Sequence, residues 1–255
     1  MTISLEETMK RVVTFAFLIL IFVCSTPVVT SAETSFTISP PPITNPKFEK
    51  NESSGKFDLT LISISSDNYS AGGGGGDLKL RHAFTDFLAI DGQIGAYAIG
   101  GEYEDSDRTT EMSTFPMSAN LEVQPYKNDS FNFILFGGGN YQYSSLTSEN
   151  DNDEFEADLY LSGFQVGAQV GIFLDSFLLS PFAYHVTKSG TLETEDRDID
   201  VDSVDANVIG FDIKYIPWNL SLSTLLQAAE QATDDDDDQD SGDSTTLIFQ
   251  LGYSW

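Results

Sequence analysis

The chain is poor in several residue types, and each scarcity excludes a class of protein. One cysteine, Cys24, cannot form a disulfide within the chain. Lysine and arginine number 12 against 40 aspartates and glutamates, for a net charge of −28, so the chain lacks the basic surface that nucleic-acid binding requires. No apolar stretch approaches the roughly 18 residues of a membrane-spanning helix. Any passage through a membrane must therefore use strands closed into a barrel, which satisfy their backbone hydrogen bonds in lipid.

Residues 1–32 have the features of a secretory signal peptide. Lys10 and Arg11 give the segment a positive start, residues 12–23 form a short apolar stretch, and residues 30–32 are the small residues of a cleavage site. Cleavage would remove the single cysteine.

Residues 33–55 differ in composition from the rest of the chain. They contain three consecutive prolines at 40–42 and a fourth at Pro46, among small polar residues. This composition is typical of an irregular linker, and we expect it to be flexible rather than folded.

From residue 56 to the C-terminus, apolar residues alternate with small or polar ones, which is the period of a β-strand. Ten segments reach about ten residues, the length that a tilted strand needs to cross lipid. In the first of them the alternation changes phase at Ile62, which predicts a bulge or an early strand end. The predicted strands are residues 56–65, 71–82, 88–101, 112–124, 131–145, 157–173, 177–189, 203–216, 219–229 and 245–255.

Short and long connections alternate between these strands. The short ones lie near 83–87, 125–130, 174–176 and 217–218, and the long ones near 102–111, 146–156, 190–202 and 230–244. With their flanks, the long connections hold 26 acids, opposed only by Arg108 and Arg197. Short turns at one end and long loops at the other are typical of outer-membrane barrels.

The last strand carries a pattern of its own. Its side chains fall on two faces, an apolar one with Leu247, Phe249, Leu251, Tyr253 and Trp255, and a small polar one with Gln250, Gly252 and Ser254. The segment resembles the C-terminal assembly signal of bacterial outer-membrane β-barrels, which alternates apolar residues and ends in an aromatic residue, most often Phe. The resemblance assigns the assembly signal to Phe249, Leu251, Tyr253 and Trp255.

This resemblance implies an all-β fold for residues 56–255: a closed, antiparallel, up-and-down transmembrane β-barrel of the small monomeric OmpA, OmpW or porin-like kind. Ten strands are expected, with eight or twelve as alternatives. The barrel would lie in the bacterial outer membrane, with residues 33–55, the short turns and both ends in the periplasm and the acidic loops outside. Its expected partners are outer-membrane lipid, lipopolysaccharide and the barrel-assembly machinery.

Charged residues on the polar face of the strands predict a network inside the barrel. A turn centred near Thr85 would place Lys79 opposite Asp91, with Arg81 one diagonal step away. Buried charges need partners, and three bases and three acids supply them. We expect a network that closes the lumen, and the alternative is a constriction that selects ions. The six residues are Lys79, Arg81, Asp91, Glu122, Asp212 and Lys214.

Two resemblances to enzymes are weaker. His185-Val186-Thr187 is similar to the His-x-Ser of outer-membrane lipid A deacylases, but Thr replaces Ser and His185 is expected to face the lumen. Omptin-like proteases also have ten strands and carry acids and histidine at the external end, where this chain has one histidine. The other, His82, is expected at the opposite rim, so no metal pair is predicted. We expect that the chain is not an enzyme, with these two activities as distant alternatives.

The densest acidic run lies at residues 234–243. Asp234, Asp236, Asp238 and Asp240 predict at most weak binding of Ca²⁺ or Mg²⁺, because no Glu closes the loop as in an EF-hand. A solvated loop is the other interpretation, and no other cofactor is expected.

The leading functional hypothesis is a structural or surface-interacting barrel whose acidic loops attract divalent cations or partners. The alternative is a narrow, cation-preferring channel.

Overall fold

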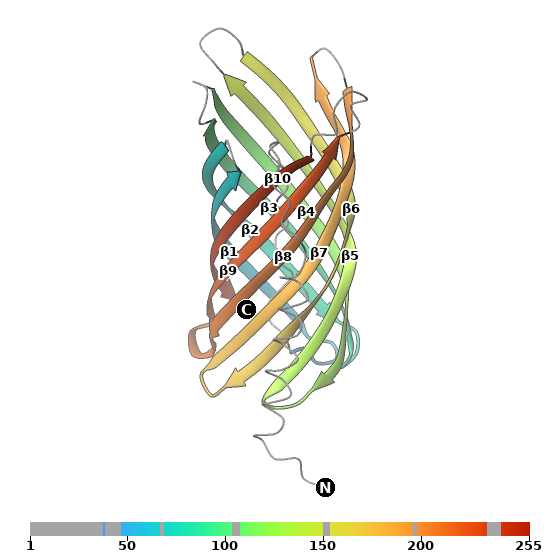
Figure 1. Ribbon diagram of the computed structural model, residues 1–255. Coiled ribbons are helices and arrows are strands. Elements are labelled where there is room, and N and C mark those ends of the chain that lie inside the picture. The colour runs from blue at the N-terminus through green and yellow to red at the C-terminus, as the bar shows by residue number, and fades with distance from the viewer. Residues whose placement is uncertain are drawn as a thin grey trace.

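The structure is a computed structural model that describes residues 38, 47–66, 69–103, 108–149, 154–195, 198–233 and 241–255. Ten antiparallel strands follow one another around a closed barrel in which β1 pairs with β10 (Figure 1). The predicted fold and strand number are confirmed. No helix within the described ranges is long and apolar enough to cross a membrane. The strands are β1 (Ser53–Ser66), β2 (Tyr69–Ala83), β3 (Leu88–Tyr103), β4 (Thr109–Lys127), β5 (Phe131–Glu149), β6 (Glu154–Leu174), β7 (Phe177–Thr194), β8 (Asp198–Tyr215), β9 (Leu220–Thr233) and β10 (Ser241–Ser254).

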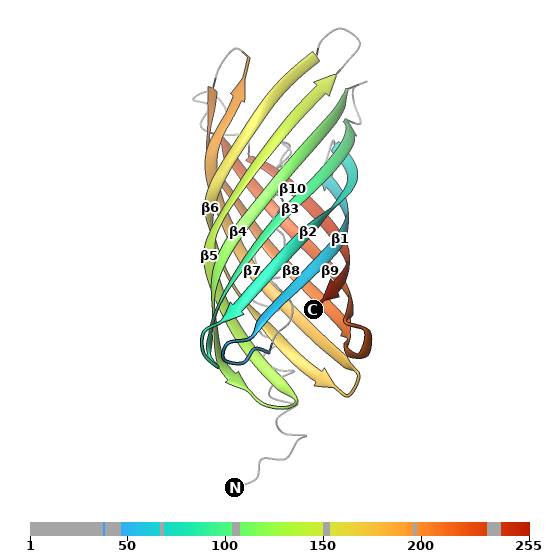
Figure 2. The ribbon, with the colours of Figure 1, turned by 180° about the vertical axis from the view of Figure 1, so that it is seen from behind.

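The barrel has two distinct ends. At the turn end, short connections join β2 to β3, β4 to β5, β6 to β7 and β8 to β9, and the last includes the 3₁₀ helix η1 (Ile216–Trp218). At the opposite end, which we call the loop end, strands continue into the segments expected to be long loops. β5 reaches Glu149 and β6 begins at Glu154, so most of the expected loop 146–156 is strand. Glu149, Glu154 and Glu156 are therefore part of the paired strands. The β5–β6 hairpin is the tall one at the loop end in Figure 2.

Two sets of outward-facing aromatic side chains bracket an apolar band on the outer face. Near the loop end, Phe115, Tyr143 and Tyr160 lie opposite one another on β4, β5 and β6, with ring centroids 6.1 and 5.2 Å apart. At the turn end, Trp218 contacts Tyr215 edge-on at 5.3 Å. The outward residues of β4 from Phe115 to Val123 cover the band between the two sets, which matches the 9–11 residues that a tilted strand uses to cross lipid.

Toward the loop end of this band the alternation inverts. Above Phe115, Tyr143 and Tyr160, the outward positions become Ser113, Ser145 and Asp158. Apolar side chains point inward here and in the adjoining part of the band, and they form a buried cluster, which we call the upper cluster. Its members include Ile38, Ile62, Ile64, Tyr69, Ile99, Met112, Phe182, Tyr184, Val186, Val208, Leu225 and Ile248. The loop-end part of the barrel is thus built as in a water-soluble protein, with apolar residues inside and polar residues outside.

This inversion explains the phase change seen in the first strand. β1 has neither a bulge nor an early end: it pairs without a register shift with β2 and β10. Phe57, Leu59 and Leu61 face outward, whereas Ile62 and Ile64 face the lumen. The predicted bulge was wrong because the environment of each face changes along the strand while the pairing does not.

Candidate functional site

Toward the turn end, five charged side chains of alternating sign lie next to one another along the inner face of the barrel wall. Asp58 of β1 lies between two lysines, with its oxygens 3.1 Å from Lys56 Nζ and 2.8 Å from Lys79 Nζ. Lys56 Nζ also lies 2.8 Å from Asp212, and Lys79 Nζ lies 3.0 Å from Asp77. All five side chains are at most 2% exposed, so these charges depend on one another rather than on water. We call these five residues the ion chain.

Neutral side chains extend both ends of the ion chain. Ser223 donates to Asp212 Oδ2 at 2.5 Å. At the other end, Asp77 Oδ2 accepts from Thr60, Tyr97 and Gln250 at 2.9–3.2 Å. Since these residues come from β8, β9, β10, β1, β2 and β3, the network connects more than half of the wall and includes the β1–β10 seam.

A second cluster lies on the neighbouring wall. Arg81 of β2 forms a two-point ion pair with Glu122 of β4, at 2.6 and 2.8 Å. Asp91 of β3 accepts from Asn120 Nδ2 at 2.8 Å, and Gln165 Nε2 donates to Asn120 Oδ1 at 2.9 Å. Charge pairing and amide bridges thus fill this side of the lumen as well.

The structure places all six predicted network residues on the lumen side, but not all in the predicted pairs. Lys79 does not lie opposite Asp91. The hairpin turn is centred at Asp86 rather than Thr85, so Arg81 faces Asp91 and Lys79 faces Gln93. Lys214 lies on β8 next to Asp212 along the same face, and no ion pair of Lys214 is present among the described residues.

Sequence reasoning missed three members of the ion chain: Lys56, Asp58 and Asp77. The signal was present. Lys56 and Asp58 alternate with Phe57 and Leu59, and Asp77 lies two residues before Lys79, on the same face. The phase change in the first strand concealed the first two.

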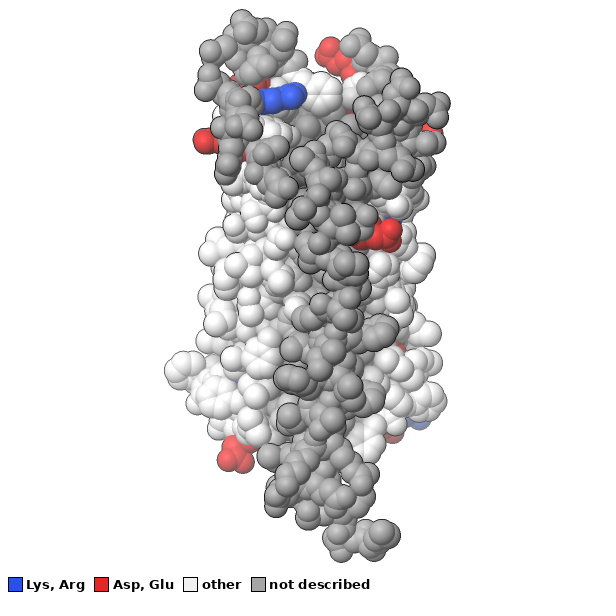
Figure 3. Space-filling model, viewed as in Figure 1, with Lys and Arg blue, Asp and Glu red and all other residues white. Residues whose placement is uncertain are grey.

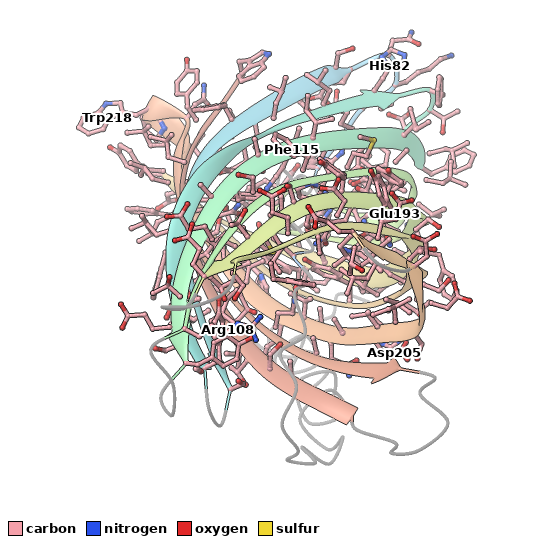
Figure 4. The ribbon with its side chains drawn as sticks, turned by 90° about the horizontal axis from the view of Figure 1, so that it is seen from above. His82, Arg108, Phe115, Glu193, Asp205 and Trp218 are labelled. Carbon is pink, nitrogen blue, oxygen red and sulfur yellow. The ribbon has the colours of Figure 1, made fainter. Side chains whose placement is uncertain are left out.

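Part of the segment before β1 also lies in the lumen. Ile38 and Phe48 are each 1% exposed. Ile38 belongs to the upper cluster, and Phe48 packs against Ala83, Ala89 and Ile134 toward the turn end. This differs from the expected flexible linker: these two residues are packed against the inner wall. Viewed along the barrel axis, side chains crowd the interior while Trp218 points outward (Figure 4).

His185 faces the outer surface, so the prediction that it faces the lumen was wrong. The inward positions of β7 are Phe182, Tyr184 and Val186. His185 Nδ1 lies 3.1 Å from Asn207 Oδ1, and its Nε2 lies 3.5 Å from Asp205, both on β8. No hydrogen bond between His185 and Thr187 is present among the described side chains.

His82 lies at the turn end, as expected, where its Nδ1 is 2.8 Å from Ser53 Oγ. Within the described ranges, no three or more His, Cys, Asp or Glu side chains group together to hold a metal ion. The four predicted metal ligands Asp234, Asp236, Asp238 and Asp240 lie outside the described residues.

Acids that are described line the loop end. Glu102, Glu111, Glu149, Glu156 and Glu193 are all exposed there. Arg108 lies among them and donates through Nε to Ser148 Oγ at 2.7 Å. On the face seen in Figure 3, most of the described charged side chains lie at the top, at the loop end, with one acidic side chain nearer the middle and a few charges near the base.

The terminal strand has the predicted faces. Phe249, Leu251, Tyr253 and Trp255 point outward and are 46–56% exposed. Trp255 also completes the seam: Gly55 and Trp255 each donate their backbone N–H to the other's carbonyl, at 3.0 Å.

No family model and no curated protein matches the chain. Among solved structures, the chain is similar to the outer membrane protease OmpT from Escherichia coli, with 8% identity and a TM-score of 0.57 over 80% of this chain and 96% of that one. It also matches the translocator domain of the autotransporter NalP from Neisseria meningitidis (7% identity, TM-score 0.48, covering 79% and 88%). A third match is the outer membrane protein OprG from Pseudomonas aeruginosa (10%, 0.37, covering 81% and 97%). The OmpT likeness shows that the chain has the fold of bacterial outer-membrane β-barrels, and identity this low shows the fold alone.

Proposed function

We propose that this chain is a closed outer-membrane barrel that acts at the cell surface, where its acidic loop end attracts divalent cations or positively charged partners. In this proposal the turn end lies in the periplasm and the loop end outside the cell. The expected assembly machinery, lipopolysaccharide contact and monomeric state belong to the same proposal. No catalytic step is part of it.

The burial and mutual contacts of the described side chains inside the barrel are the observation that carries this proposal. Toward the turn end, the ion chain and the Arg81–Glu122 pair occupy the interior. Toward the loop end, the upper cluster occupies it. A conducting pore needs a continuous polar passage, which paired charges and packed apolar side chains oppose.

The inverted alternation supports a role outside the membrane. With outward serines and acids above the aromatic residues, the loop-end part of the barrel suits water rather than lipid. The acids it carries are poorly balanced by bases. Such a surface concentrates cations nearby, an effect that weakens as salt screens it.

Removing the charge of exposed acids at the loop end, which we call the acidic rim, should weaken cation binding. In the variant Glu149→Gln/Glu156→Gln/Glu193→Gln, we expect a labelled hexalysine peptide to bind lipid-reconstituted protein roughly threefold more weakly at low salt, because exposed charges each contribute little on their own. Fluorescence anisotropy would measure this, with Mg²⁺ as a competitor. The matched control is Asp129→Asn, which removes an exposed acid at the turn end. Equal binding by all three proteins would refute the rim as the binding surface.

Planar-bilayer recordings separate the proposal from the channel hypothesis. We expect little steady conductance from the wild-type barrel, because side chains fill its lumen at both ends. A steady, cation-selective current would favour the narrow channel instead.

A further inference from the structure

Two sites on the lumen wall hold the backbone of the segment that precedes β1. At the first, the Ile38 N–H donates to Gln142 Oε1 at 3.1 Å, and the Ile38 carbonyl accepts from Lys188 Nζ at 3.3 Å. Lys188 Nζ also donates to Gln142 Oε1 at 2.8 Å, which connects the two wall residues. We call Gln142 and Lys188 the upper clamp.

The second site repeats this arrangement near the turn end. Gln124 Oε1 accepts from the Phe48 N–H at 3.3 Å, and Gln124 Nε2 donates to the Phe48 carbonyl at 3.0 Å. Lys127 Nζ donates to the same carbonyl at 3.1 Å. We call Gln124 and Lys127 the lower clamp. In each clamp a glutamine oxygen and a lysine meet the two polar groups of one residue, as a neighbouring strand would.

Next to each clamp, residues of the wall also pack against the side chain of the bound residue. Ala83 and Ala89 face one another across β2 and β3, and their small size leaves room for the Phe48 ring. The Arg81 guanidinium lies 5.5 Å from the centre of that ring. Ile38 is packed in the upper cluster. Backbone clamps combined with side-chain pockets are the usual means of binding an extended peptide.

Two exposed contacts continue the lower clamp outside the lumen. Asp86 accepts from the Lys50 N–H at 3.2 Å and from Lys127 Nζ at 3.2 Å. The Lys50 N–H and then the Lys127 ammonium hold the pKa of Asp86 below its usual range. Lys127 thereby connects the lower clamp to the β2–β3 turn.

We propose that the lumen wall carries two sites for peptide backbone, one that takes an aliphatic residue at the upper clamp and one that takes an aromatic residue at the lower clamp, occupied here by the chain's own Ile38 and Phe48. This goes beyond the proposed function, because it assigns a peptide-binding role to residues of the inner wall, at the end of the barrel where each clamp lies.

Protection of a single thiol tests whether the site is occupied. In a Cys24→Ser background, Ile38→Cys should react with a polyethylene-glycol maleimide at least about tenfold more slowly than Lys50→Cys, because labelling requires a buried residue to leave its site. Lys50 is exposed at the turn end and serves as the matched control. Both should react fully after heating in SDS. Equal rates in the folded protein would overturn the proposal.

Removing the upper clamp tests what holds the peptide. In the Ile38→Cys protein, Gln142→Ala/Lys188→Ala should raise the labelling rate about tenfold, the order expected when two buried hydrogen bonds are lost. The control is Gln165→Ala, a buried lumen glutamine that donates to Asn120 and Ser118 of the wall. The clamp would be contradicted if the labelling rate of Ile38→Cys stayed the same in this variant while the barrel still changed its SDS-gel mobility on heating, as a folded barrel does.

If the clamp variant fails to fold, the single Ile38→Cys measurement still decides occupancy. The outcomes also separate the two proposals. Rapid labelling of Ile38→Cys contradicts the peptide site and leaves the acidic rim intact. Equal hexalysine binding by wild type, the rim variant and its control contradicts the proposed function and leaves the peptide site intact.

Discussion

Replacing Asp58 by alanine should lower the free energy of unfolding by about 3–5 kcal/mol, the range found when one partner of a buried ion pair is removed. Asp58 contacts both Lys56 and Lys79, and none of the three has appreciable access to water. Its loss leaves two buried ammonium groups to share Asp212 and Asp77. Urea unfolding from lipid vesicles, followed by tryptophan fluorescence, would measure the change.

Asp86→Ala is the matched control for this prediction. Asp86 also lies near a lysine, with Lys127 Nζ at 3.2 Å, but its side chain is 65% exposed. Solvent screens an exposed pair, so its removal should change stability little. Adding Lys79→Met to Asp58→Ala should recover part of the lost stability, with a coupling of about 1 kcal/mol or more. Equal midpoints for Asp58→Ala and Asp86→Ala would contradict the dependence of the barrel on the ion chain.

Deleting Trp255 should reduce the amount of folded barrel in the membrane severalfold. The deletion removes both backbone hydrogen bonds to Gly55, at the start of the β1–β10 seam, together with an outward aromatic side chain at the turn end. The heat-modifiable band of membrane fractions in SDS gels would report the folded amount.

Two variants separate the causes. Trp255→Phe should fold normally, because it keeps the backbone pairing and an outward aromatic ring. Trp218→Ala removes an even more exposed tryptophan at the same end, from η1 rather than from the seam. If deletion of Trp255 behaves like Trp218→Ala, the seam and the assembly signal have no special role.

Strand number and most faces followed from the sequence because period-two alternation is local. The register of the β2–β3 hairpin did not follow, since a shift of the turn centre from Thr85 to Asp86 changes every partner but no face. The predicted pair of Lys79 with Asp91 failed for this reason. Lys56 and Asp58 were within reach of the same alternation, because they lie on the polar face at the start of the first strand.

Other features have no local signal. Ile62 and Ile64 face inward while their neighbours Ser63 and Ser65 face outward, a change of polarity between the faces that a uniform lipid environment along the strand does not predict. The position of Ile38 depends on Gln142 and Lys188, 104 and 150 positions away in the chain. His185 was assigned to the wrong face because it lies where apolar and polar side chains exchange sides along β7.

The contacts of Ile38 also constrain the order in which the molecule can be built. Ile38 is synthesised before every strand. Its clamp, however, exists only once β5 and β7 have both paired with β6, which lies between them. Contacts of such large sequence separation form late, because the entropy of closing the intervening chain must be overcome first. Ile38, which is synthesised before every strand, is therefore among the last described residues to reach its native contacts.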